Sequence, residues 1–195
     1  MPTAGCDPEV LRAEEQARAC LLRRAGLVGP YASAECELGR EAYRRARGGR
    51  GTYLWGEPGT GKTYAACCCA RLFVEDGARA RKVTAKRLLD EIKESWDARD
   101  HRDPDAMRYF ERLDLLVLDD LGTERPTPWA VEELTRLIDT RAEEGLPTVV
   151  TSNWRIGALR DMWGGMEGKR IASRLAGACE PVEVAGPDRR LGCSR

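Results

Sequence analysis

The chain has 195 residues, no formal net charge and a charged fraction of 33%, which is typical of a globular domain and excludes an intrinsically disordered chain. No apolar run approaches the roughly 20 residues that a helix needs to cross a bilayer, and the N-terminal residues lack the basic and then apolar order of a secretion signal. We therefore expect a cytoplasmic protein without a membrane partner, in which any contact with nucleic acid depends on a local basic patch.

Two helices are predicted before the first strand. Residues 9–25 carry mostly apolar side chains at helical spacing, and this helix ends at Gly26. Residues 35–47 form a second, arginine-rich helix that ends at a run of glycines. We assign residues 1–48 to an N-terminal helical segment and residues 49–195 to the main domain.

Strands and helices alternate along the main domain. The predicted strands cover residues 52–55, 81–84, 115–118, 148–151 and 182–184. The predicted helices cover residues 62–75, 85–99, 104–112, 128–144, 156–163 and 167–177. Because mainly apolar strands are joined by helices, the pattern predicts an α/β fold of three layers, with a central parallel sheet covered by helices on both faces.

The most specific motif follows the first predicted strand and opens the next helix. It fits the pattern G-x-x-x-x-G-K-[ST] and consists of Gly56, Glu57, Pro58, Gly59, Thr60, Gly61, Lys62 and Thr63. Glycines let the backbone amides turn toward phosphate oxygens, and the helix adds its positive end. The lysine reaches the β- and γ-phosphates, and the threonine hydroxyl binds Mg²⁺. The motif predicts a site for ATP and Mg²⁺, since the strand–loop–helix context disfavours the alternative of a glycine-rich turn beside a surface lysine.

Polar residues also follow two of the later predicted strands. Asp119 and Asp120 come directly after the strand at 115–118, and Asn153 follows the strand at 148–151. Because ligands of open α/β sheets bind at the carboxyl ends of the strands, we expect Asp119 to hold Mg²⁺ through water. Asp120 is expected to orient or deprotonate the attacking water, and Asn153 to bond the γ-phosphate or that water. An acidic turn and an asparagine turn are the ordinary alternatives.

The eight cysteines indicate neither a metal site nor a disulfide framework. They are Cys6, Cys20, Cys36, Cys67, Cys68, Cys69, Cys179 and Cys193. No pair has the C-x-x-C spacing of zinc ligands, His101 is the only histidine, and a reducing compartment disfavours disulfides. We expect these residues to be mostly buried thiols.

Taken in order, these segments resemble the DnaC/IstB-type AAA+ ATPases, which include bacterial and phage replicative helicase loaders. The resemblance runs from residue 25 to residue 190, and its most specific feature is the combination of GEPGTGKT, LDDLG, TSN and RIASRL. It implies that residues 49–195 form a AAA+ ATPase core of the P-loop NTPase class, with short N-terminal helices and no separate lid domain.

The resemblance also implies roles for residues that the pattern alone leaves open. Asn153 corresponds to the sensor-1 residue, and Arg174 corresponds to the arginine finger that completes the ATP site of a neighbouring subunit, which requires self-association. Arg170 is the rival candidate for the finger, and ordinary surface arginines are the alternative for both. Asp120 stands where most AAA+ proteins have glutamate, which predicts slow turnover.

Residues 85–113 correspond to a helical insertion that faces single-stranded DNA in related loaders and initiators. Its candidate contacts are Lys86, Arg87, Lys93, Arg99, His101, Arg102 and Arg108, with Trp96 and Tyr109 as stacking groups. Acidic residues are interspersed, so a solvated surface of mixed charge is an equally good interpretation.

The expected function is ATP-dependent loading of a replicative helicase onto single-stranded DNA, with slow, DNA-stimulated hydrolysis. A transposition helper ATPase of the IstB type has nearly the same motifs and stays open. A small-molecule P-loop kinase would have no use for RIASRL. A nucleotide-locked adaptor with negligible turnover is a further alternative.

Overall fold

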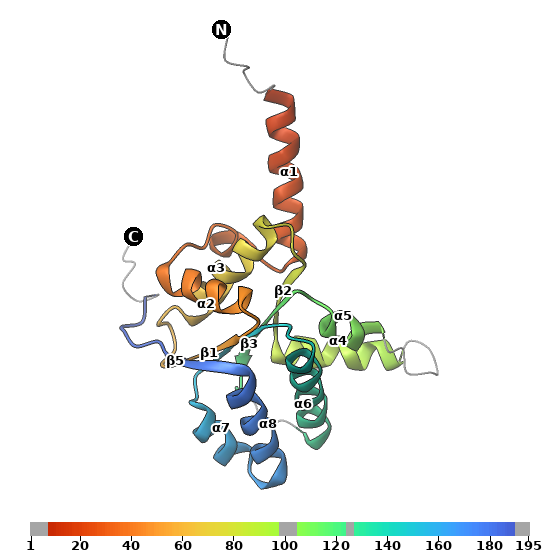
Figure 1. The fold of residues 1–195 in the computed structure, drawn as a ribbon, viewed down its shortest axis with the longest axis vertical. Helices are drawn as coiled ribbons and strands as arrows, with labels where there is room; N and C mark the ends of the chain where they lie inside the picture. Colours follow the sequence, from red (N-terminus) through yellow and green to blue (C-terminus); the bar gives the residue numbers. More distant parts are fainter. Residues whose placement is uncertain (1–7, 98–104, 124–126, 190–195) are drawn as a thin grey trace.

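The computed structural model describes residues 8–97, 105–123 and 127–189. These residues contain a parallel sheet of five strands in the order β2-β3-β4-β1-β5, drawn in Figure 1. The strands are β1 (Gly51–Trp55), β2 (Ala80–Thr84), β3 (Leu115–Leu121), β4 (Thr148–Ser152) and β5 (Cys179–Glu183). The predicted parallel sheet is confirmed.

Helices fall close to the predicted ranges. They are α1 (Pro8–Arg24), α2 (Glu37–Arg47), α3 (Lys62–Glu75), α4 (Ala85–Asp97), α5 (Asp105–Glu111), α6 (Pro128–Glu143), α7 (Ile156–Trp163) and α8 (Gly165–Ala178), with a short 3-10 turn at Gly29–Tyr31. At the start of α6, the Thr127 side chain accepts a hydrogen bond from the Ala130 amide, as expected for a threonine cap before a first-turn proline. No helix in the described part of the chain is long and apolar enough to cross a membrane.

The last strand begins three residues earlier than predicted, and β3 continues past its apolar run. β5 starts at Cys179, which pairs with Gly51 of β1, and it contains Pro181. An edge strand tolerates a proline and charged side chains because one of its sides needs no partner strand. The sequence of β5 therefore lacks the apolar pattern by which the inner strands were predicted.

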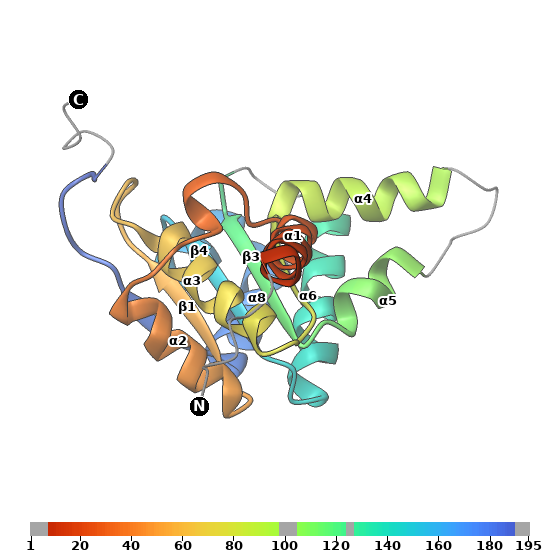
Figure 2. The same ribbon diagram turned by 90° about the horizontal axis from the view of Figure 1, so that it is seen from above.

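The sheet is the middle of three layers, as seen from above in Figure 2. On one face, α2 and α3 pack against side chains such as Leu54 and Val117. On the other face, α4, α5, α6 and α8 pack against side chains such as Tyr53 and Leu118. Alternate strand residues thus face separate cores, which is why the inner strands are apolar throughout.

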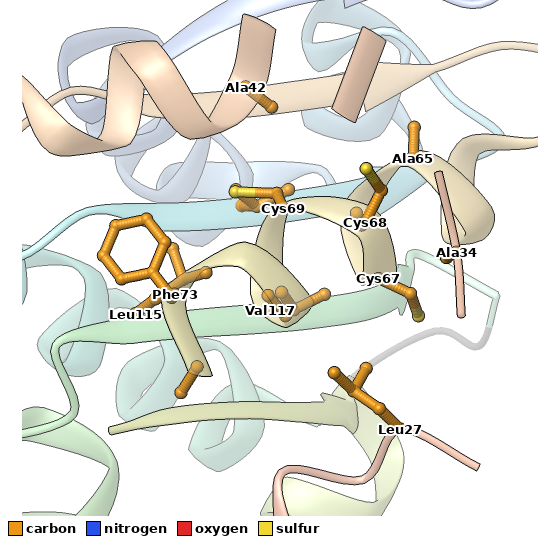
Figure 3. Close-up of a cluster of buried hydrophobic side chains, with 14 of the residues drawn as sticks. Leu27, Ala34, Ala42, Ala65, Cys67, Cys68, Cys69, Phe73, Leu115 and Val117 are labelled. Atoms are coloured by element: carbon orange, nitrogen blue, oxygen red, sulfur yellow. The ribbon is translucent and has the colours of Figure 1, made fainter. Parts of the chain in front are cut away.

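Helix α3 is the most deeply enclosed helix of the first face. Its cysteines Cys67, Cys68 and Cys69 are fully buried and leave the helix in different directions, as Figure 3 shows. A Cβ added at Gly39 of α2 would lie 2.4 Å from the Cys68 Cβ of α3. The two helices can therefore approach this closely only because residue 39 is glycine. The predicted buried thiols are confirmed here and at Cys179, whereas Cys36 is half-buried and Cys20 is exposed; Cys6 and Cys193 lie outside the described residues.

Helix α1 extends away from the body of the molecule in Figure 1. The helix itself was predicted, but the apolar face expected for it is not used for packing: Val10, Leu11 and Leu21 are about half exposed, and Leu22 is the buried residue of this helix. Only the end of α1 therefore contributes to the core.

A buried arginine joins α6 to the sheet. The Arg141 side chain is fully buried and donates to the backbone carbonyls of Phe110, Glu111, Leu113 and Pro147 and to the Thr148 hydroxyl. Burial lowers the pKa of its guanidinium to about 10. These bonds tie the turns before β3 and β4 together at the edge opposite the phosphate loop.

Candidate functional site

The loop between β1 and α3 has a backbone that glycine permits. Gly56, Gly59 and Gly61 have φ values of 145°, 79° and 102°, which side-chain-bearing residues rarely adopt. A Cβ at Gly56 would also lie 2.5 Å from the Val184 carbonyl oxygen. The loop therefore takes the shape expected of a phosphate-binding loop, between a strand and a helix as predicted.

Lys62 is folded back over this loop. Its Nζ donates to the Gly56 carbonyl at 2.7 Å and to the Glu57 carbonyl at 2.8 Å, and the residue is buried. Thr60 closes the turn by donating to the Glu57 carbonyl, while Pro58 is exposed. Helix α3 begins after Gly61, which has no side chain that could cap the first turn.

Asp119 is the centre of the polar contacts at this edge of the sheet. Its Oδ1 accepts from the Thr63 hydroxyl at 2.9 Å and from the Thr151 hydroxyl at 2.6 Å. Its Oδ2 lies 3.1 Å from the Lys82 Nζ. The structure thus joins the phosphate loop, β3, β4 and β2 through one buried carboxylate.

Lys82 is held in its charged form by this contact. Burial alone would lower the pKa of the Lys82 ammonium, but the charge of Asp119 and the hydrogen bond to it outweigh burial and leave that pKa raised. The Lys82 Nζ also lies 5.6 Å from the centre of the Tyr31 ring, which adds a weaker cation–π attraction.

A shift of register separates the two aspartates. The pairing of β3 with β4 is irregular between Leu118 and Leu121, and Asp120 between them has a φ of 61°. Its amide donates to the Thr151 hydroxyl at 2.9 Å. Such an irregularity redirects side chains, and here it leaves Asp120 exposed beside the buried Asp119.

The turn after β4 places Asn153 at the same edge. Ser152 pairs with Trp55, the last residue before the phosphate loop, and its hydroxyl donates to the Leu121 carbonyl. The Tyr53 hydroxyl donates to the Trp154 carbonyl. Asn153 is exposed between these anchored neighbours.

The residues at this edge fit a magnesium ion. A threonine hydroxyl has one hydrogen and two lone pairs, so Thr63 can donate to Asp119 and still offer lone pairs to a cation. Threonine and aspartate oxygens are the hard ligands that Mg²⁺ prefers, and Mg²⁺ keeps several of its waters. Thr63 and Asp119 would hold the ion, directly and through water respectively.

Arg174 does not join this group of residues. It is exposed on α8, and its Nε lies 2.8 Å from an Asp139 carboxylate oxygen on α6. The rival Arg170 is also exposed on α8. Neither residue has a described contact with the phosphate loop of its own chain.

The chain after β5 returns to the phosphate loop. The Arg189 amide donates to the Gly59 carbonyl at 3.0 Å. A Cβ at Gly61 would lie 3.4 Å from the Arg189 guanidinium, and one at Gly59 would overlap the Asp188 carboxylate. A charged segment distant in sequence therefore covers part of the loop; Arg190 lies outside the described residues.

Sequence reasoning gave no role at this site to Thr151 or Lys82. Thr151 could have been noticed because it is a hydroxyl residue within an apolar strand that ends at the site. Lys82 lies in a strand of mixed character, Ala-Arg-Lys-Val-Thr, and its partner becomes evident only from the pairing of β2 with β3.

Comparison with known proteins identifies the family. The family model described as IstB-like ATP binding protein matches residues 49–195. The chain belongs to the IstB-like ATP-binding proteins. The resemblance to DnaC/IstB-type AAA+ ATPases is thereby confirmed, together with the P-loop fold.

Individual relatives come from replication and from transposable elements. The replicative helicase loader DnaI of Bacillus subtilis (strain 168) is 24% identical over 159 residues, which are 77% of this chain and 50% of that protein. An ATP-binding protein in an insertion sequence of Mycobacterium tuberculosis (strain ATCC 25618 / H37Rv) is 28% identical over 76% of this chain and 59% of that protein. A crystal structure of DnaI superimposes with a TM-score of 0.65 at 28% identity, covering 77% of this chain and 81% of that one. The chain spans about half the length of the first of these relatives.

Proposed function

We propose that this IstB-like protein binds ATP with Mg²⁺, hydrolyses it slowly, and uses the cycle to load a replicative helicase onto single-stranded DNA. The observation that carries the nucleotide part is the 2.9 Å hydrogen bond between Thr63 of the phosphate loop and Asp119 of β3. It unites the two motifs that hold phosphate and metal in P-loop ATPases. Residues 49–195 are the proposed ATPase core, with residues 1–48 as a helical extension.

The site residues take the following proposed roles. Residues 56–63 bind the phosphates, and Lys62 exchanges its two backbone carbonyls for phosphate oxygens, which are stronger acceptors. Asp120, exposed at the edge of the sheet, orients or deprotonates the attacking water. Asn153 holds the γ-phosphate or that water, and Arg174 acts on the nucleotide of a neighbouring subunit.

Nucleotide binding is tested by calorimetry with ATP and Mg²⁺. We expect Lys62→Ala to weaken binding about 100-fold, since it removes two charge-assisted hydrogen bonds of about 1.5 kcal/mol each. Lys169→Ala is the matched control, because it removes an exposed lysine from α8. Equal ATP affinities of Lys62→Ala and the unmodified chain would show that the loop does not bind nucleotide.

A basic cleft supports single-stranded DNA as a partner. It has a volume of about 680 Å³ and lies between the end of α1, the turn after α3, and α5; its charged lining consists of Arg24, Arg79, Arg108 and Arg112. Tyr109 also lines it and is 46% exposed. Arginines neutralise phosphates, and an exposed ring stacks on bases.

The DNA contact is tested by binding of an oligonucleotide at several salt concentrations. The double variant Arg108→Ala, Arg112→Ala should weaken binding and reduce the salt slope by about 2, one for each lost phosphate contact. Arg44→Ala, Arg47→Ala removes two exposed arginines from α2 as a control. An unchanged salt slope in the variant that lacks Arg108 and Arg112 would exclude this cleft.

A transposition helper is the second candidate function, because the insertion-sequence relative shares 28% identity with this chain. The two functions differ in the partner protein and not in the ATP site. Proteins captured on the ATP-bound chain with single-stranded DNA should include a replicative helicase if the chain is a loader, and a transposase if it is a transposition helper.

A further inference from the structure

Lys82 contacts one of the two carboxylate oxygens through which Asp119 would hold a metal-bound water. The Lys82 side chain is 18% exposed and the Asp119 side chain 7%, so solvent screens this pair weakly. The other carboxylate oxygen already accepts from Thr63 and Thr151. Both oxygens of Asp119 are therefore satisfied by groups of the chain itself.

The cation is fixed in this place by its surroundings. The Lys82 backbone amide donates to the Ala25 carbonyl at 2.7 Å, which anchors this part of β2 to the segment after α1. The Tyr31 ring covers the ammonium. The backbone hydrogen bond to Ala25 and the contact with the Tyr31 ring therefore both position Lys82 beside Asp119.

A magnesium ion and this ammonium carry charges of the same sign and use the same carboxylate. An ion held between Thr63 and Asp119 would lie a few ångströms from the Lys82 Nζ, in a region of low effective dielectric, where repulsion is strong. The two cations are therefore linked: each lowers the affinity of Asp119 for the other, and by the same factor.

We propose that Lys82 is a built-in counter-ion of Asp119 that competes with Mg²⁺ and so raises the Mg²⁺ concentration at which this chain binds ATP tightly. The inference rests on the proposed binding of Mg²⁺ and ATP at this site. It makes Lys82 a positioning residue, which acts through Asp119 and not on the phosphates.

The test is a Mg²⁺ titration of fluorescent ATP binding to the full chain, starting in EDTA. Lys82→Met should reduce the half-saturating Mg²⁺ concentration about fivefold or more, which is the lower end of typical coupling between linked ligands. Lys82→Arg keeps the charge and should stay within about twofold of the unmodified chain, by the same linkage.

Arg81→Met is the matched control. Arg81 is the neighbouring residue of β2, carries the same charge, and is also ion-paired, but its partner is Glu91 of α4, on the opposite face of the sheet. It should leave the Mg²⁺ requirement unchanged. Lys82→Met and Arg81→Met each remove one positive charge, so their long-range electrostatic effects are the same. Only the contact with Asp119 distinguishes them.

Melting temperatures separate binding from folding, and Lys82→Gln is measured if Lys82→Met does not fold, because glutamine can donate a neutral hydrogen bond to Asp119. An unchanged or increased Mg²⁺ requirement in a folded Lys82 variant would overturn the inference. If instead the unmodified chain binds no nucleotide at any Mg²⁺ concentration, the proposed function itself is wrong.

Discussion

The two regions of this molecule to which we assign roles in phosphate chemistry are built in opposite ways. At the carboxyl edge of the sheet, Thr63, Thr151 and Lys82 all contact one buried carboxylate. On α8, Arg174 is exposed and paired with a single surface residue, Asp139. The site proposed to bind nucleotide is assembled from buried contacts within one chain, whereas the arginine proposed to act on a second chain lies at the surface.

The largest expected effect concerns the surface side. Arg174→Ala should bind ATP normally but lose about 10³–10⁵ in DNA-stimulated hydrolysis, the usual worth of an arginine finger. Adding the Lys62→Ala chain should partly restore activity, because its intact Arg174 can act on the functional ATP site of an Arg174→Ala chain. Phosphate release from single and mixed variants measures this.

Arg160→Ala is the control, since Arg160 is likewise exposed and paired with an aspartate, Asp161. A fully active Arg174→Ala chain would contradict a role of Arg174 in a neighbouring ATP site. The same conclusion would follow if the two variants co-assemble but their mixture hydrolyses ATP no faster than either variant alone. Arg170 would then be tested in the same way.

The next effect concerns the edge of the sheet. Asp120→Asn should reduce hydrolysis about 10²–10⁴-fold, the range for loss of a general base, while ATP binding is kept because Asp119 is untouched. Single-turnover hydrolysis and nucleotide affinity are measured together. Hydrolysis at the unmodified rate would show that Asp120 does not activate the water.

A third prediction contrasts the exposed Arg174 with the buried Arg141. Arg141→Leu should lower the free energy of unfolding by about 3 kcal/mol or more, because each buried carbonyl that loses its donor costs about 1–3 kcal/mol. Urea unfolding measures this. Arg44→Leu on α2, which removes an exposed arginine paired with the exposed Glu37, should change stability by less than about 0.5 kcal/mol.

The last prediction concerns two buried thiols and changes stability only at alkaline pH. Burial raises the pKa of Cys67 and of Cys179 from 9.0 to about 12. The folded chain therefore keeps these protons while the unfolded chain releases them, so stability is full below pH 9 and falls as the pH rises from 9 toward 12. The slope is about 1.4 kcal/mol per pH unit for each thiol.

This slope is measured by urea unfolding at several alkaline pH values. Cys179→Ala should show a shallower fall than the unmodified chain, and Cys20→Ala, which removes an exposed thiol, should not. Equal slopes in all three chains would show that the Cys179 thiol ionises in the folded chain as readily as in the unfolded chain.

The sequence allowed prediction of the features that depend on local pattern. The phosphate loop was predictable because its glycines, lysine and threonine have fixed spacing, and Asp119 because an apolar strand delivers it to the sheet edge. Lys82 was not predictable in this way, because its contact depends on which strands are neighbours. The packing of α1 was not predictable either, since helical spacing indicates a face but not what covers it.

The backbone at Asp120 restricts which side chain can serve as the proposed general base. Its φ of 61° lies in the left-handed region, where aspartate and asparagine are far more common than longer side chains. A glutamate placed there would gain one methylene of reach but would carry a conformational cost at the same position. The backbone conformation at this position therefore favours aspartate over glutamate, whatever the chemistry requires. A variant with glutamate in place of Asp120 would need a change in the backbone of β3 as well as a longer side chain.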